Sequence, residues 1–104
     1  MNKKQDVFQL IENIRERPGM YIGECSIIRL RAFVYGYAYA IYEIGLGMDI
    51  FQLLKDFNDY IQKSYHIEST EGWDKILLSK CNNDEEKAFK LFGKKWDDFL
   101  AKHK

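Results

Sequence analysis

The stretch "NNDEEKAFKLFGKKWDDFL", residues 82–100, decides the fold that this chain is expected to adopt. Asn82 and Asn83 each precede a glutamate by three residues, which is the capping-box pattern of a helix start. The apolar side chains that follow recur at three- and four-residue steps, as one face of a helix requires. They are Phe89, Phe92, Trp96, Phe99 and Leu100. We therefore predict a last helix with an aromatic stripe that faces the core.

The same helical spacing begins near the start of the chain. In "DVFQLIENIRER", residues 6–17, apolar side chains alternate with polar ones at helical intervals. Asp6 is a plausible N-cap, because its carboxylate can accept hydrogen bonds from free amides of the first turn. Pro18 should end this helix, since it has no amide hydrogen and disfavours helical geometry in the residue before it.

A second helix is expected to begin near Ser26 and to run to about Glu43 or Ile44. Gly45 and Gly47 then offer the left-handed backbone geometry that commonly ends a helix. One face of this helix carries the spacing of a core. Its residues are Ile27, Leu30, Val34, Tyr37, Ala38 and Ile41.

Two further helices complete the predicted fold. Asp49 should cap a third helix, and Ser69 or Thr70 a short fourth one that carries Trp73, Ile76 and Leu77. The core positions of the third helix are Phe51, Leu54, Phe57, Tyr60 or Ile61, and Tyr65. No stretch alternates with period two for long, so the sequence predicts an all-α fold of about five helices in one compact, bundle-like domain over residues 1–104.

The composition of the chain limits the classes of function that it can have. Sixteen basic and 16 acidic side chains give zero net charge, which argues against a general nucleic-acid binder. No apolar run reaches the ~20 residues of a membrane span, and no apolar secretory core follows the first lysines, so we expect a cytoplasmic protein with no membrane partner. Cys25 and Cys81 fit neither a metal-ligand nor a disulfide pattern, and we expect them to be small hydrophobic residues in a reduced protein.

The most distinctive short motif is "RPGMYIG", residues 17–23. It resembles a segment of the ATPase subunits of type II topoisomerases, which would imply a nucleotide site. In that family the following helix carries a Glu and an Asn, whereas "LRAFVYGYAYAIYEIG", residues 30–45, contains Glu43 but no Asn. The family's Asp-x-Gly-x-Gly motif and glycine-rich lid are also missing, so the groups that phosphoryl transfer needs are not present.

The motif is better interpreted as a structural corner between two helices. Pro18 would end the first helix, and Gly19 would permit a turn that a side chain obstructs. Gly23 would free the chain before the second helix begins. The apolar residues between the two glycines are expected to pack back between the helices.

No group of residues in the sequence predicts an active site, a metal site or a bound cofactor. His66 and His103 have no cysteine or aspartate at ligand spacing, so we name no catalytic and no metal-binding residue. Tyr35, Tyr39 and Tyr42 share one side of the second helix. These tyrosines either line the core with their hydroxyl groups in water or form an anchor for a protein partner.

Five carboxylates are the second candidate for partner binding. They are Asp84, Glu85, Glu86, Asp97 and Asp98. The first three lie in the first turn of a predicted helix, where acidic residues also favour the helix dipole and the cap. Their charge could alternatively complement the basic cleft of a nuclease.

Over nearly its whole length the chain resembles a group of small bacterial immunity proteins of contact-dependent growth inhibition and polymorphic toxin systems. The segments that carry the resemblance are "RPGMYIG", "AFVYGYAYA" at 32–40, "STEGWDKILL" at 69–78 and "NDEEKAFKLFGKKWDDFL" at 83–100. The resemblance implies a non-enzymatic antitoxin that binds a cognate toxin domain, an RNase among the candidates, and blocks its active site.

Two alternatives remain open at this point. One is a small nucleotide-binding protein or enzyme that uses the Arg17–Gly23 loop. The other is a helical regulator that binds DNA through Arg29 and Arg31. The sequence leaves the oligomeric state undecided.

Overall fold

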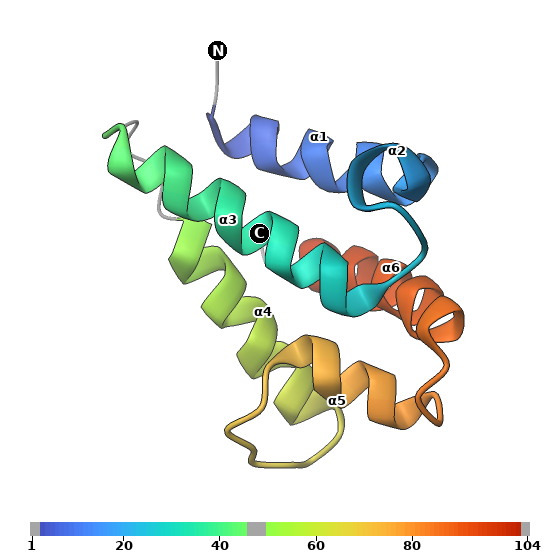
Figure 1. Ribbon diagram of the computed structural model, residues 1–104. Helices are drawn as coiled ribbons and strands as arrows, with labels where there is room; N and C mark the ends of the chain where they lie inside the picture. The colour runs from blue at the N-terminus through green and yellow to red at the C-terminus, as the bar shows by residue number, and fades with distance from the viewer. Residues whose placement is uncertain (1–2, 46–49, 103–104) are drawn as a thin grey trace.

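Six helices form the regular structure of residues 3–45 and 50–102, which are the residues that this computed structural model describes (Figure 1). They are α1 (Lys3–Glu16), α2 (Pro18–Ile22), α3 (Ile27–Glu43), α4 (Ile50–Ser64), α5 (Trp73–Lys80) and α6 (Glu85–Lys102). The prediction of an all-α fold is confirmed. The helix beyond the expected five is α2, a single turn inside the predicted corner.

Helix α3 runs diagonally across the front of the molecule, with α6 behind it (Figure 1). It packs against α4, α5 and α6, and therefore forms the centre of the arrangement. Helices α1 and α2 lie along the upper side, and α4 and α5 along the lower side. One continuous hydrophobic core takes side chains from all six helices.

Phe57 of α4 stands at the centre of that core. Its side chain is 0% exposed, and four aromatic rings meet it edge to face. The ring-centroid distances are 5.3 Å to Trp73, 5.7 Å to Phe92, 5.1 Å to Trp96 and 5.3 Å to Phe99. Edge-to-face packing at this distance is favourable because the positive ring edge meets the negative ring face. The predicted aromatic stripe of the last helix is thus confirmed as a core element.

The ends of the first two long helices agree in part with the prediction. α1 ends at Glu16, just ahead of Pro18 as expected, but it begins at Lys3. Asp6 therefore lies inside the helix, and its predicted role as N-cap is wrong. Helical propensity carried the helix a turn further, because Lys and Gln are good helix formers.

The predicted cap of α3 is confirmed. Ser26 has an extended backbone, with φ −137° and ψ 119°, and its hydroxyl oxygen accepts a hydrogen bond from the amide of Arg29. α3 ends at Glu43, and Gly45 follows in the left-handed region with φ 70°. The predicted roles of Gly47 and Asp49 lie outside the described residues.

The predicted caps of the last two helices are wrong in register. α5 begins at Trp73 behind Gly72, so neither Ser69 nor Thr70 caps it. Asp84 caps α6, because its carboxylate accepts a hydrogen bond of 3.1 Å from the amide of Lys87.

Asn82 and Asn83 form the turn ahead of α6 rather than its capping box. Both adopt left-handed backbone geometry, with φ 54° and 64°. Asparagine tolerates this geometry better than most residues do, so the pair suits a tight turn. The sequence analysis placed the cap at the two asparagines, whereas the structure places it at the aspartate that follows them.

Candidate functional site

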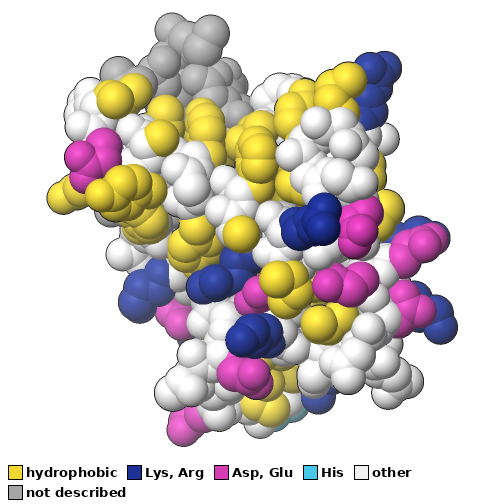
Figure 2. All heavy atoms as spheres, in the orientation of Figure 1, with side chains coloured by type: hydrophobic (Ala, Val, Ile, Leu, Met, Phe, Trp, Pro, Cys, Tyr) yellow, Lys and Arg dark blue, Asp and Glu magenta, His cyan; other side chains and the backbone are white. Residues whose placement is uncertain are grey.

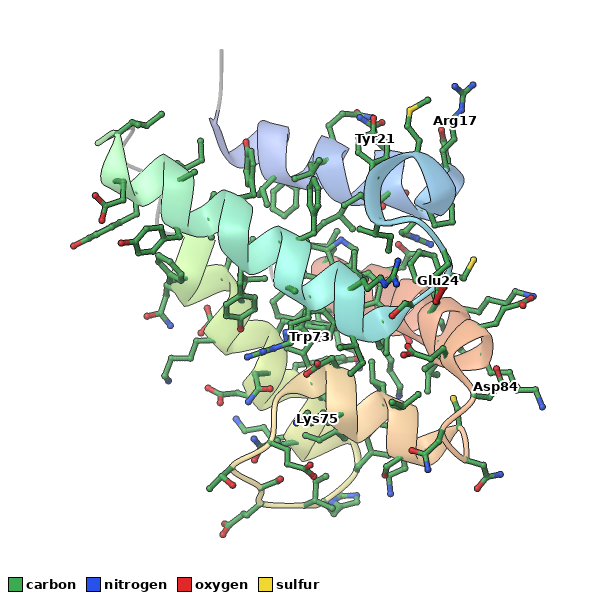
Figure 3. The ribbon with its side chains drawn as sticks, in the orientation of Figure 1. Arg17, Tyr21, Glu24, Trp73, Lys75 and Asp84 are labelled. Carbon is green, nitrogen blue, oxygen red and sulfur yellow. The ribbon has the colours of Figure 1, made fainter. Side chains whose placement is uncertain are left out.

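The motif at residues 17–23 forms the corner between α1 and α3. Arg17 precedes α2 and projects away from the body of the molecule (Figure 3). Of the three apolar residues expected to pack inward, Ile22 is buried and Tyr21 is half-buried. Met20 is 68% exposed, so its predicted inward packing is wrong. A helix of five residues cannot turn three consecutive side chains to the same side.

The two glycines of the corner differ in what they contribute. Gly23 has φ 88°, and a Cβ atom there would lie 2.7 Å from Nη1 of Arg29. That nitrogen donates a hydrogen bond of 3.0 Å to the carbonyl oxygen of Ile22. A Cβ atom at Gly19 would meet nothing within 4 Å, so the prediction that a side chain would obstruct the turn there is wrong.

Replacing Gly23 by alanine should therefore lower the free energy of unfolding by about 1 to 2 kcal/mol, the usual cost of left-handed geometry for an L-residue. Gly19→Ala is the matched control, and we expect it to be neutral or stabilising by up to about 1 kcal/mol, because alanine favours helix α2. Urea unfolding of both variants measures the difference. Equal effects of the two substitutions would contradict this account of the corner.

The three candidate tyrosines of α3 do not share one environment. Tyr39 and Tyr42 are 59% and 65% exposed. Tyr35 is half-buried, and the guanidinium of Arg31 lies over its ring with 4.3 Å between Cζ and the ring centroid. The Tyr35 ring therefore packs against the body of the molecule, whereas the other two rings face solvent. Hydrophobic side chains gather along this helix in the upper half of the face drawn in Figure 2.

Two apolar residues that the sequence did not single out as binding residues extend this surface. The ring of Phe51, in the first turn of α4, meets the ring of Tyr42 at 6.1 Å and 71°. Phe51 was predicted to be a core residue, but it is 37% exposed. Ile44 is 65% exposed at the end of α3. We call Tyr42, Ile44 and Phe51 the α3–α4 surface.

The acidic residues at the start of α6 have structural roles. Asp84 caps α6 at the right-hand edge of the molecule (Figure 3). The carboxylate of Glu85 accepts a hydrogen bond of 3.0 Å from the amide of Ile27, and so ties α6 to the start of α3. Glu86 forms an ion pair of 3.6 Å with Lys90 on the same helix. The interpretation of these carboxylates as capping and dipole groups therefore fits the structure well.

Asp97 and Asp98, the two acidic residues near the end of α6, have different environments. The carboxylate of Asp97 accepts two hydrogen bonds from Arg15, of 2.8 Å and 3.1 Å, which tie α1 to α6. These bonds raise the pKa of Arg15. Gly93 makes room for them, since a Cβ atom there would lie 2.9 Å from the Arg15 guanidinium. Asp98 is exposed and has no ion pair within the described part of the chain.

Tyr42 and the carboxylates at the start of α6 do not form one site. Glu85 binds the first residue of α3, whereas Tyr42 lies fifteen residues further along that helix. At the rise of an α-helix, this separation is about 22 Å. The structure thus brings Tyr42 together with Phe51 rather than with the acidic residues.

The arginines proposed for a DNA-binding role are engaged within the molecule. Arg29 donates to the carbonyl oxygen of Ile22. Arg31 lies between the Tyr35 ring and Asp74, with Nε 3.4 Å from Oδ1 of the aspartate. Asp74 is 4% exposed, so this ion pair links α3 to α5 at the edge of the core. The pair acts as an interhelical contact rather than as part of an open basic surface.

A hollow of about 400 Å³ lies between α4 and the end of α6. Its lining residues are Asp56, Asp59, Tyr60, Lys63, Phe99 and Lys102. Two carboxylates and two lysines line it, so its formal charge selects neither an anion nor a cation. Nearby, burial raises the pKa of Tyr65, whose ring faces the ammonium groups of Lys80 and Lys95 at 5.0 Å and 4.8 Å.

No protein-family model, curated protein or solved structure significantly matches the chain. Over residues 3–45 and 50–102, no three His, Cys, Asp or Glu side chains are placed to hold a metal ion. Within the same ranges, no helix combines the length and hydrophobicity that a membrane span needs. The α3–α4 surface remains the best-defined candidate site of the described chain.

Proposed function

We propose that this protein is a cytoplasmic, non-enzymatic immunity protein that binds a cognate bacterial toxin domain and covers its active site. The observation that carries the proposal is the α3–α4 surface. Tyr42 and Ile44 are each 65% exposed beside Phe51, although the chain has a well-formed aromatic core in which to bury such side chains. Clustered exposed aromatic and aliphatic residues are typical of surfaces that become buried against a protein partner.

The placement of its two rings on helices supports a binding role. Tyr42 lies in the last turn of α3, and Phe51 in the first turn of α4, between core residues Ile50 and Leu53. The edge-to-face contact between the two rings restricts the rotamers of both. A surface that is ordered before binding loses little conformational entropy on association, so more of the buried area contributes to affinity.

An RNase is the toxin class that the exposed carboxylates would suit. Nucleases bear basic clefts that bind phosphate groups, and negative charge on an inhibitor accelerates encounter with such a cleft. Asp98 is the member of the predicted acidic set that is available for this role, because Asp97 is held by Arg15. Charge reversal at Asp98 alone is therefore the informative variant, since changing Asp97 would also break the Arg15 contact between α1 and α6.

The direct test is co-expression with the toxin domain encoded beside the gene of this protein, scored by growth and by co-purification.

Tyr42→Ala should weaken toxin binding by about 2 kcal/mol, or roughly 30-fold, if the ring is a central anchor. Calorimetry of the purified pair measures this change. The thermal midpoint should stay close to that of the original protein, because the ring is mostly in solvent.

Met20→Ala is the matched control, since Met20 is equally exposed but lies on α2, away from the α3–α4 surface. Its affinity for the toxin should remain unchanged. An unchanged affinity of Tyr42→Ala would remove Tyr42 from the interface, and equal losses in the two variants would show that the effect is not specific to the α3–α4 surface. Lack of both protection and co-purification with every neighbouring toxin domain would reject the immunity function.

A further inference from the structure

The outward face of α3 carries an apolar strip bounded by opposite charges. All of its residues are exposed. They are Arg29, Ala32, Phe33, Gly36, Tyr39, Ala40 and Glu43, and we call them the α3 strip. Within this strip a positive charge stands at the first position and a negative charge at the last, with no charged residue between them. Two large rings and three very small residues alternate in the interior.

The α3 strip is symmetric about Gly36. Arg29 and Glu43 each lie seven residues from that glycine. Ala32 and Ala40 each lie four residues away, and the two rings, Phe33 and Tyr39, each lie three residues away. The symmetry therefore exchanges a cation with an anion, and a small residue with another small residue.

We propose that a second copy of this chain packs on the α3 strip, with the two α3 helices antiparallel and the two-fold axis at Gly36. This inference goes beyond the proposed function and does not depend on it. An antiparallel pair centred there places Arg29 at the level of Glu43 of the second copy, and the same contact forms twice. Opposite charges at both ends fix the direction and the register of the helices.

The apolar residues fit the same arrangement. At 100° per residue, Phe33 and Ala40 lie on one flank of the strip, and Tyr39 and Ala32 on the other. A two-fold axis at Gly36 brings each ring against the alanine of the same flank on the second copy. Large side chains then fill the space above small ones, and Gly36 allows the helices to approach closely at the crossing point.

The observations favour a second copy over an unrelated helix. A single set of residues satisfies both ends of the pairing, as an isologous interface requires. A parallel pair would instead bring arginine beside arginine and glutamate beside glutamate. Arg29 is also prepared for the contact, because among the described residues its Nη1 alone donates a hydrogen bond, to Ile22, which leaves its other donors for a carboxylate.

The expected dimer is weak. A helix of 17 residues is about 25 Å long, so the contact falls at the lower end of the sizes seen for specific interfaces. We expect a dissociation constant in the micromolar range. Tyr42 and Phe51 lie toward α4, beside the strip rather than in it, and they stay exposed in this dimer.

Sedimentation velocity over a concentration series tests the proposal on the purified protein, whose monomer mass is 12.4 kDa. Gly36→Glu should weaken self-association at least about tenfold, because two carboxylates would meet on the axis. The substitution should not unfold the monomer, since a Cβ atom at Gly36 meets nothing within 4 Å. Gly19→Glu, at an equally open glycine of α2, is the control and should leave self-association unchanged.

A charge exchange tests the register. Arg29→Glu and Glu43→Arg should each weaken self-association. In an equimolar mixture of the two variants, position 29 of each copy carries the charge opposite to position 43 of the other. The mixture should therefore form a heterodimer with two ion pairs. Circular dichroism melting checks that each variant is folded. A protein that stays monomeric up to about 1 mM, or a mixture that associates no better than its components, would overturn the proposal. None of these outcomes depends on toxin binding, so the two proposals fail separately.

Discussion

Phe57→Ala is expected to lower the free energy of unfolding by about 4 kcal/mol, the largest effect of any single substitution considered for this protein. Phe57 is 0% exposed and meets four rings from α5 and α6. Its removal leaves a cavity whose walls are rigid aromatic rings, and such walls relax little into the space. Loss of the edge-to-face contacts adds to the loss of buried apolar area.

Because a domain of this size is typically stable by about 5 to 15 kcal/mol, the substitution should remove between about a quarter and four fifths of the stability. Phe51→Ala is the matched control on the same helix, and it should cost about 1 kcal/mol or less because that ring is partly in solvent. Urea unfolding followed by tryptophan fluorescence compares the two. A cost below about 1 kcal/mol for the buried position would contradict the central role of this ring.

Arg31→Met is expected to cost about 2 to 3 kcal/mol, the second largest effect. Asp74 is 4% exposed, and Arg31 supplies the cation beside it, so the substitution leaves a carboxylate buried without that charge. The cost falls below that of a fully buried pair because the Arg31 side chain is 36% exposed and Asp74 lies in the first turn of α5, where the helix dipole favours an anion. The stacking of the guanidinium on Tyr35 is lost as well.

Two further variants separate the contributions of this pair. Arg31→Lys keeps the charge but loses the planar stacking, so its stability should lie between those of the original protein and Arg31→Met. Adding Asp74→Asn to Arg31→Met should recover part of the loss, because no net charge then remains buried. If the double variant is as unstable as the sum of the single ones, the two side chains do not interact.

The core of this fold could be read from the sequence because its helices are strongly amphipathic. The spacing of Phe89, Phe92, Trp96 and Phe99 has one helical solution, and the structure buries all four. The end of α1 could also be predicted, because proline excludes continuation of a helix. Helix starts were harder to predict. Several polar residues near Asp84 could each accept the same amide hydrogen bond, and only tertiary contacts decide between them.

The residues of the candidate site were harder to predict from the sequence, for a related reason. A tyrosine on the flank of an amphipathic helix can face either the core or solvent, and the helix's neighbours determine which. The Arg31 guanidinium covers the Tyr35 ring, whereas no cation lies over the Tyr42 ring among the described residues. The exposure of Phe51 was also hidden, since its spacing is that of a core residue. Pairing between Arg15 and Asp97, 82 residues apart, leaves no local signal in the sequence.

The position of Phe57 has a consequence for synthesis of the protein. Three of the four rings that meet it edge to face, Phe92, Trp96 and Phe99, belong to α6, the last helix of the described residues. A ribosome must translate through residue 99 before these rings can close around α4, so the nascent chain carries its earlier helices with an unfinished interior. Folding of the described helices should consequently occur late and in one step, after α6 has been synthesised.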